Sequence, residues 1–288
     1  MTKSERNNMT PLLISSDNLS VAWSRVFLHI VDNPGTHISP LVVSINGFDE
    51  KGLPAEDLAV RFELDTVLAK LNAFNVEDVA YTIFPQRLWE MSQGNRQTLY
   101  QFYKWAFPGY QATNRKWNRK GLYFERLVQF GRGPKDGNQL EWILSQYQQR
   151  HDVRRSMLQA SIFDPERDHV PEAQTGFPCL QQVSFVPTSE GLVVNAFYAT
   201  QQALRRAYGN CLGLAQLGAF MAHEMKLPLA QLNVTAGIEK MDGKGEGKTS
   251  PLLDKLKVAA RSCVAEDDAR HADRATGIRI IASQAVAV

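Results

Sequence analysis

Cysteine and long hydrophobic runs are scarce in this sequence, and each absence excludes a class of protein. The three cysteines, Cys179, Cys211 and Cys263, lie far apart and form no CxxC pair. An odd and widely spaced set of thiols argues against a disulfide framework and against a zinc site, so we expect no metal. No apolar stretch approaches the ~18 residues that span a bilayer, so we also expect no membrane partner.

The sequence also lacks an excess of one charge and an N-terminal secretion signal. Its formal net charge is +2, and Met1–Asn8 is polar and charged. The charge balance gives no electrostatic reason for a nucleic-acid partner. The basic and aromatic stretch Tyr110–Arg126 could line a nucleic-acid groove, but we favour a solvated loop with packed side-chain stems. We therefore expect a cytoplasmic protein that does not bind nucleic acid.

What is present fits an ordinary globular chain. The 288 residues are 44% hydrophobic and 22% charged, and a chain of this length can bury a core without disulfide bonds or a structural metal. We find no internal repeat and no linker that separates two halves. We therefore predict one domain over residues 1–288, with flexible segments at residues 1–16 and 243–250.

Helical periodicity dominates the first half of the chain. Leu19–Val31 places its apolar residues on one face, and Asp17 can cap it. Leu41–Ile45 is a short apolar run typical of a buried strand. The other predicted helices are Ala55–Leu71, Thr98–Phe107 (ending at Pro108–Gly109) and Asn138–Gln149.

The second half combines strands with one long apolar helix. Gln182–Val186 and Leu192–Tyr198 are joined by a turn-rich segment and predict a hairpin. Gln202–Leu227 exceeds strand length, so we predict a buried central helix whose glycines (Gly209, Gly213 and Gly218) permit either close packing or a break near its start. Further strands are predicted at Arg155–Ala160, Gln231–Lys240 and, after one more helix, Gly277–Val288. The expected fold class is α+β, a mixed β-sheet with flanking helices.

Five segments in the second half carry a family resemblance. In order, they read DVRRSMLQASIFDP, FPCLQQVSFV, EGLVVNAFY, LGLAQLGAFMAHEM and LNVTAGIEKMD. In this order and spacing, over Tyr123–Asp242, they resemble the thymidylate synthase and deoxycytidylate hydroxymethylase superfamily. Before them, only SQGN at Ser92–Asn95 is similar to a family segment. The resemblance implies a thymidylate-synthase-like mixed sheet.

Cys179 stands, by this resemblance, at the position of the family nucleophile. Carbon 5 of a pyrimidine is a poor nucleophile until another group adds to carbon 6. A thiolate adds there readily and can leave again afterwards, provided that nearby cations lower its pKa. The alternative is a buried structural cysteine, which is common for this residue type.

Other polar residues occupy positions that the resemblance links to the nucleotide. Arg154 and Arg155 match adjacent arginines that reach the phosphate across a dimer interface, so we expect a homodimer. Arg205 and Arg206 lie near a second phosphate-binding segment. The alternative for each pair is an exposed surface position. Within the central helix, Asn210 stands near a family aspartate, and Gln216 is either a reader of the pyrimidine edge or a hydrogen-bonded core residue.

Several family positions have changed. The residue after the nucleophile is Leu180 rather than histidine, and Lys240 and Asp242 replace a pair that contacts the sugar hydroxyl. Glu90 is out of register with the family's general-acid glutamate. The resemblance implies folate-dependent one-carbon transfer (methylation or hydroxymethylation) to carbon 5 of a pyrimidine nucleotide monophosphate, with 5,10-methylenetetrahydrofolate as donor. These changes keep open a catalytically inactive nucleotide-binding or assembly protein, so enzymatic activity is not assigned.

Overall fold

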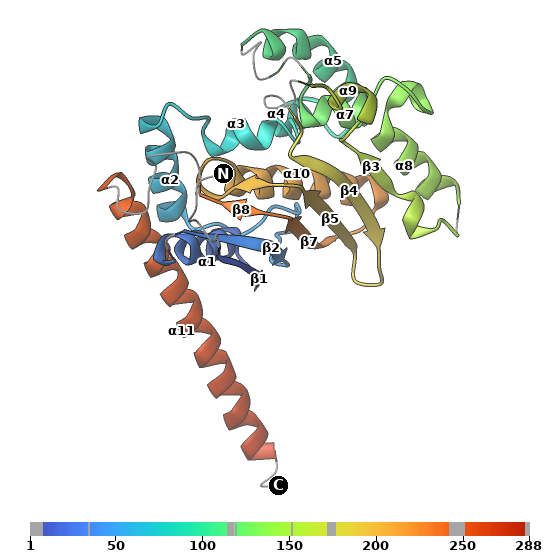
Figure 1. The fold of residues 1–288 in the computed structure, drawn as a ribbon. Coiled ribbons are helices and arrows are strands. Elements are labelled where there is room, and N and C mark those ends of the chain that lie inside the picture. Colours follow the sequence, from blue (N-terminus) through green and yellow to red (C-terminus); the bar gives the residue numbers. More distant parts are fainter. Residues whose placement is uncertain are drawn as a thin grey trace.

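The computed structural model describes residues 8–33, 35–113, 118, 120–150, 152–171, 177–241 and 251–285. This part of the chain forms an eight-stranded mixed sheet with helices against it (Figure 1). The strands are β1 (Asn8–Ser16), β2 (Thr36–Ile45), β3 (Gln159–Ser161), β4 (Leu180–Pro187), β5 (Leu192–Tyr198), β6 (Gln201–Gln202), β7 (Leu229–Ala236) and β8 (Glu239–Lys240). The predicted α+β class with a mixed sheet is confirmed.

The sheet is built around the predicted hairpin. Its main path is β3-β4-β5-β7-β2-β8-β6, with β1 pairing beside β2. The β4–β5 pair is antiparallel, β5 pairs with β7 in parallel, and β7 runs antiparallel to β2. Along β5 and β7, buried residues alternate with residues that are partly exposed. One face therefore supplies the core, as expected for a sheet covered on one side.

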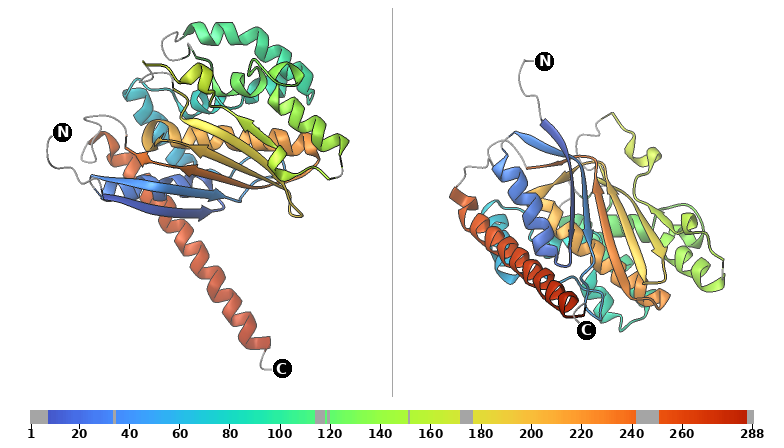
Figure 2. Two further views of the ribbon diagram at one scale, coloured as in Figure 1. Left: turned by 45° about the vertical axis from the view of Figure 1, so that its right-hand side comes forward. Right: turned by 90° about the horizontal axis from the view of Figure 1, so that it is seen from below.

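Helices pack over the buried face of the sheet in more than one layer (Figures 1 and 2). They are α1 (Leu19–Asp32), α2 (Leu58–Lys70), α3 (Val76–Tyr81), α4 (Gln86–Met91), α5 (Arg96–Thr113), α7 (Tyr123–Val128), α8 (Gln139–Gln149), α9 (Pro165–Asp168), α10 (Tyr208–Met225) and α11 (Asp254–Ala285). Short turns are 3-10 helices at Lys135–Gly137, Arg155–Met157 and Pro251–Leu253, and a π-helical turn at Ala203–Ala207. None of the described helices combines the length and apolar character needed to cross a bilayer.

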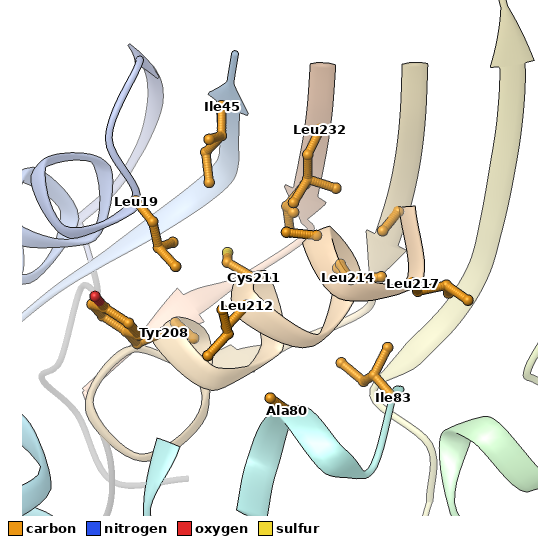
Figure 3. Packing of buried hydrophobic residues seen from close by; sticks show 14 of the residues in the cluster. Leu19, Ile45, Ala80, Ile83, Tyr208, Cys211, Leu212, Leu214, Leu217 and Leu232 are labelled. Atoms are coloured by element: carbon orange, nitrogen blue, oxygen red, sulfur yellow. The ribbon is translucent and has the colours of Figure 1, made fainter. Parts of the chain in front are cut away.

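The central helix α10 lies between the sheet and α3, as its apolar sequence predicted. In Figure 3, Cys211 lies on the side of the helix that faces Leu232 of the sheet, whereas Ala80 and Ile83 lie on the opposite side of the helix. A Cβ atom at Gly209 would lie 2.6 Å from the Cβ of Val79, so a glycine is required for this close approach. Of the two roles predicted for the α10 glycines, this confirms close packing.

Three predicted segment ends differ in the structure. The cap of α1 is Asn18 rather than Asp17, and its Oδ1 accepts from the N–H groups of Ser20 and Val21 at 2.8 and 3.2 Å. Helix α5 continues through Pro108 to Thr113, past the predicted end, although a proline inside a helix removes one N–H from the hydrogen-bond ladder and crowds the preceding turn. The strand predicted from Arg155 begins only at Gln159, where pairing with Ser184 starts.

Two terminal predictions are wrong over the residues that the structure describes. Residues 8–16, expected to be flexible, form β1 and pair in parallel with β2. The predicted C-terminal strand instead continues α11 as far as Ala285. The first turns of α11 bury Leu256 and Ala260 against the body, and the helix then extends away from it (Figures 1 and 2). Residues 243–250 lie outside the described part of the chain.

Candidate active site

A cavity of about 1160 Å³ opens between the sheet edge, the first half of α10 and the segments around α3 and α7. Four predicted site residues line it: Cys179, Arg206, Asn210 and Gln216. Arg206, Asn210 and Gln216 lie on the continuous segment formed by the π-helical turn and α10, whereas Cys179 stands before β4. The fold therefore brings a thiol, a guanidinium group and two carboxamides to one space.

Cys179 reaches the cavity because it stands directly before β4. Its carbonyl oxygen accepts a hydrogen bond of 3.0 Å from the N–H of Ala199, and the next residue, Leu180, pairs with Tyr198. The end of the β4–β5 ladder thus fixes the backbone that carries the sulfur. The side chain is half-buried, unlike those of Cys211 and Cys263 in the core.

The electrostatics around Cys179 act in opposite directions. Burial raises the pKa of the thiol, whereas the nearby charges of Arg206 and Lys240 lower it, and the net direction is upward. The neutral thiol is therefore the dominant form in the free protein at neutral pH. Any reaction at this sulfur needs a further stabilisation of the thiolate when a substrate is bound.

Arg206 is presented by the π-helical turn between β6 and α10. π-Helical turns inside α-helices often occur at functional sites, because the extra residue changes where side chains point. The guanidinium carbon of Arg206 lies 5.3 Å from the centre of the Phe74 ring. Among the described residues, no carboxylate lies within ion-pair distance of it. Its neighbour Arg205 does not line the cavity.

Arg154 and Arg155 lie away from the cavity. Arg155 begins the 3-10 turn that precedes β3, and Arg154 stands directly before that turn. Both side chains are exposed, and neither lines the cavity of its own chain. The four arginines that the sequence singled out do not converge within one chain. Arg206 is the member of this set that faces the thiol.

Asn210 and Gln216 lie on α10 and are almost completely buried, with 4% and 5% of their surfaces exposed. Both line the cavity. Gln216 therefore belongs to the cavity wall rather than to the core alone. A carboxamide offers a donor and an acceptor side by side, which suits the edge of a pyrimidine ring.

The structure adds aromatic residues that the sequence did not single out. Tyr123, at the start of α7, lies beside Cys179. Burial and the nearby thiol raise the pKa of the Tyr123 phenol to about 12, although hydrogen bonds from the backbone N–H groups of Leu180 and Cys179 act in the opposite direction. Tyr81 and Tyr110 pack with ring centroids 4.5 Å apart in the same cavity wall. The solvated-loop interpretation is therefore wrong for Tyr110 and Tyr123. Residues 114–117 and 119 lie outside the described part.

One wall of the cavity is held by a buried ion pair. Arg126 is 2% exposed and Asp168 is fully buried; Nη1 and Nη2 of the arginine donate to Oδ2 and Oδ1 at 2.6 and 2.8 Å. Burial alone would raise the pKa of Asp168, but the hydrogen bonds from Arg126 and the backbone lower it below its usual value. This bidentate pair locks α7 to α9.

Carboxylates are found mainly at the cavity mouth. Glu77 and Asp78 line it and are exposed, and Glu77 is bound by Arg61 at 2.9 Å. Glu90 is exposed and does not contribute to the lining. Within the described residues, then, no buried carboxylate lines the cavity with Cys179. The titratable lining residues near the thiol are Tyr123 and Lys240.

A metal centre finds little support in the described residues. Asp17, Asp267 and His271 bring ligand atoms within 4.8 Å of one another, away from the cavity. Asp267, however, already binds Arg25 and Arg270 at 3.1 and 2.7 Å. The cluster is therefore an ion-pair network in which cationic side chains already balance the carboxylate.

Comparison with known proteins gives one distant resemblance. No protein-family model matches the chain. Over 105 residues the chain is 28% identical to a protein of Methanocaldococcus jannaschii described as "Putative thymidylate synthase". The aligned region covers 36% of this chain and 46% of that protein, so the chain spans less than half of the relative that it matches. This chain has a distant thymidylate-synthase-like relationship.

Proposed function

We propose that the cavity binds a pyrimidine nucleotide monophosphate and that Cys179 adds to carbon 6 of its ring, which prepares carbon 5 for one-carbon transfer. The observation that carries this proposal is the shared cavity of Cys179, Arg206, Asn210 and Gln216. Each residue offers one of the functions that the reaction needs: a nucleophile, a phosphate ligand and two groups that can bind the ring edge. The distant thymidylate-synthase-like relationship supports the same chemistry.

In this scheme Arg206 and Lys240 also favour the reactive form of the sulfur. Their charges already oppose the effect of burial on the Cys179 pKa. A nucleotide that fills the cavity would exclude water and strengthen these interactions. Tyr123, next to the same sulfur, can hold a proton at its hydroxyl oxygen and keep the Cys179 backbone in place.

A reduced folate fits the residues present. The cavity exceeds the volume of a typical small-ligand pocket, ~300–1,000 Å³, which leaves room for a second molecule beside a nucleotide. Tyr81 and Tyr110 supply aromatic surface in its wall for a planar ring. When bound, 5,10-methylenetetrahydrofolate would supply the one-carbon unit.

A covalent-trapping experiment tests the proposed reaction. The protein is incubated with the folate and a 5-fluoropyrimidine nucleotide, in deoxyuridine and deoxycytidine forms, and its mass is measured. The expected result is an adduct on Cys179 that the Cys179→Ser variant does not form and that Cys263→Ser, altered in the core, still forms. Absence of any adduct in the wild-type protein would contradict one-carbon transfer through this thiol.

The exposed arginines support a homodimer that completes each site in trans. Arg154 and Arg155 are exposed and outside their own cavity. We propose that they reach the phosphate bound by a second copy. Mixing inactive Cys179→Ser protein with inactive Arg154→Ala/Arg155→Ala protein would then restore part of the activity, because the hybrid contains one intact site. A monomer in light scattering, or no restored activity, would contradict this arrangement.

A second function, nucleotide binding without catalysis, is favoured by two specific observations. The pKa of the Cys179 thiol is raised by burial, and no buried carboxylate among the described residues lines the cavity with it. A protein of this kind would still bind nucleotide through Arg206. In a thermal-shift assay, nucleotide would then raise the melting temperature of wild type and Cys179→Ser equally, with no effect of folate. An adduct in the trapping experiment excludes this alternative.

A further inference from the structure

Two half-buried cations face the cavity that holds Cys179. They are Arg206, from the π-helical turn, and Lys240, from β8. Both lie within electrostatic reach of the Cys179 sulfur. In the sequence, Lys240 stands only as a departure from the family pattern.

Strand pairing explains why these residues meet. β6 and β8 run in parallel, and Gln202 pairs with Lys240. The π-helical turn that carries Arg206 begins directly after Gln202. Three residues before Gln202, the N–H of Ala199 holds the carbonyl of Cys179. The two cations and the thiol are therefore fixed to one edge of the sheet.

Neither cation is neutralised by a carboxylate from the described residues. This contrasts with the ion-paired arginines of the same chain, which are Arg25, Arg61, Arg96, Arg126, Arg132, Arg167, Arg261 and Arg270. A partly buried charge is costly unless an opposite charge or hydrogen-bond acceptors compensate it. A lysine ammonium has three donors and no acceptor, so its natural partner is an anion. Arg87, Glu77 and Asp78 also line the cavity, but they are exposed and their charges are solvated. The two half-buried charges therefore call for two anionic groups.

We propose that Lys240 determines substrate specificity by binding a second anionic group, separate from the phosphate that Arg206 binds. The substrate class is then a pyrimidine nucleotide with two phosphate groups. The second phosphate can sit on the sugar, in a nucleoside 3′,5′-bisphosphate, or on the first phosphate, in a nucleoside 5′-diphosphate. This inference rests on the proposed function, because it needs the nucleotide to occupy the same cavity.

Calorimetric titration of the wild-type protein separates these substrates. The ligands are the 5′-monophosphate, the 3′,5′-bisphosphate and the 5′-diphosphate of deoxyuridine and of deoxycytidine, without folate. One doubly phosphorylated form is expected to bind at least about tenfold more tightly than its monophosphate, which is the scale of one hydrogen-bonded charge pair. Which form gains affinity identifies the position of the second phosphate.

Three variants assign that gain to Lys240. In Lys240→Gln, the doubly phosphorylated form is expected to bind within about twofold of its monophosphate. In Lys240→Arg, the difference in affinity is expected to return, because the positive charge is restored. Lys70→Gln, at the exposed end of α2, is the matched control and should keep the full gain. Affinity for the monophosphate should change little in all three variants. A general structural effect would instead weaken every ligand alike.

The outcomes separate this inference from the proposed function. If the monophosphate binds but a second phosphate adds no affinity in the wild-type protein, Lys240 is not a second anion site and the inference is overturned, while the proposed function stands. The same holds if Lys240→Gln weakens all ligands equally. If no pyrimidine nucleotide binds the wild-type protein, the proposed function fails and the inference fails with it.

Discussion

Arg126 and Arg206 line the same cavity, but their surroundings differ. Arg126 is buried, bound by both oxygens of Asp168 and by the carbonyls of Ile162 and Lys120. Arg206 is half-buried, packs on the ring of Phe74, and has no described carboxylate beside it. The first charge is satisfied by the chain itself and holds the fold. In the proposed function the second charge is balanced by a ligand, which is what would distinguish a binding cation from a structural one.

The largest expected effect is on the structural side of this comparison. Arg126→Met leaves the buried Asp168 carboxylate without its counter-charge, so the free energy of unfolding should fall by about 3–5 kcal/mol. Urea denaturation measures the change. The double variant Arg126→Met/Asp168→Leu should recover much of the loss, because no unpaired charge remains. A single variant as stable as wild type would remove the distinction between the two arginines.

Arg206→Met tests the other side. Because no described carboxylate depends on Arg206, stability should change by less than about 0.5 kcal/mol, a typical effect of substitutions away from such networks. Affinity for a pyrimidine nucleotide monophosphate should fall by about 1.5–3 kcal/mol through loss of a charged phosphate contact. Titration calorimetry gives the affinity, and Arg205→Met is the matched control, outside the cavity lining. Equal losses in both variants would place the phosphate elsewhere.

Acid should weaken the Arg126 region through Asp168. The pKa of this carboxyl is lowered in the folded protein, so its ionised form stabilises the fold above the pKa of an unfolded aspartate, about 3.9. That stability is lost as the pH falls through the folded pKa. The free energy of unfolding should therefore drop more steeply below about pH 4 in wild type than in Asp168→Asn. Parallel pH profiles for the two proteins would show that ionisation of Asp168 does not contribute to the stability of the fold.

The smallest effect concerns the thiol. Because burial raises the pKa of Cys179, its alkylation by iodoacetamide should reach half-maximal rate at a higher pH than the alkylation of the unfolded chain. Lys240→Met or Arg206→Met removes a charge that opposes this effect, so the midpoint should rise further and the rate at neutral pH should fall a few-fold. Peptide mass spectrometry separates Cys179 from the two core cysteines. An unchanged midpoint in both variants would mean that these charges do not reach the sulfur.

Segments with one dominant pattern were predictable from sequence. The β4–β5 hairpin and the buried helix α10 follow directly from apolar runs and turn residues. The structure of the C-terminal segment was not predictable in this way, because its β-branched residues favour a strand. A helix that has already formed from Asp254, however, gains one hydrogen bond for each residue added. Helix α5 likewise passes Pro108, a residue that usually ends or kinks a helix, so its predicted end was too early.

The candidate site divides in the same way. Cys179, Arg206, Asn210 and Gln216 were found through their positions in a resemblance, and the structure brings them to one cavity. The resemblance located Lys240 only as a changed position and did not single out the tyrosines, because their approach to Cys179 depends on β6–β8 pairing and on the packing of α7 against the segment before β4. Local sequence carries no signal for contacts of that kind.

Nucleotide protection of Cys179 tests the central claim most directly. The protein is treated with iodoacetamide with and without a pyrimidine nucleotide monophosphate, and modification of Cys179 is followed by peptide mass spectrometry. If the Cys179 thiol and the Arg206 guanidinium group share one binding space, the nucleotide should slow alkylation in a saturable manner in the wild type and in Arg205→Met. The nucleotide should slow alkylation much less in Arg206→Met. Alkylation at the same rate at every nucleotide concentration would show that the cavity is not a nucleotide site.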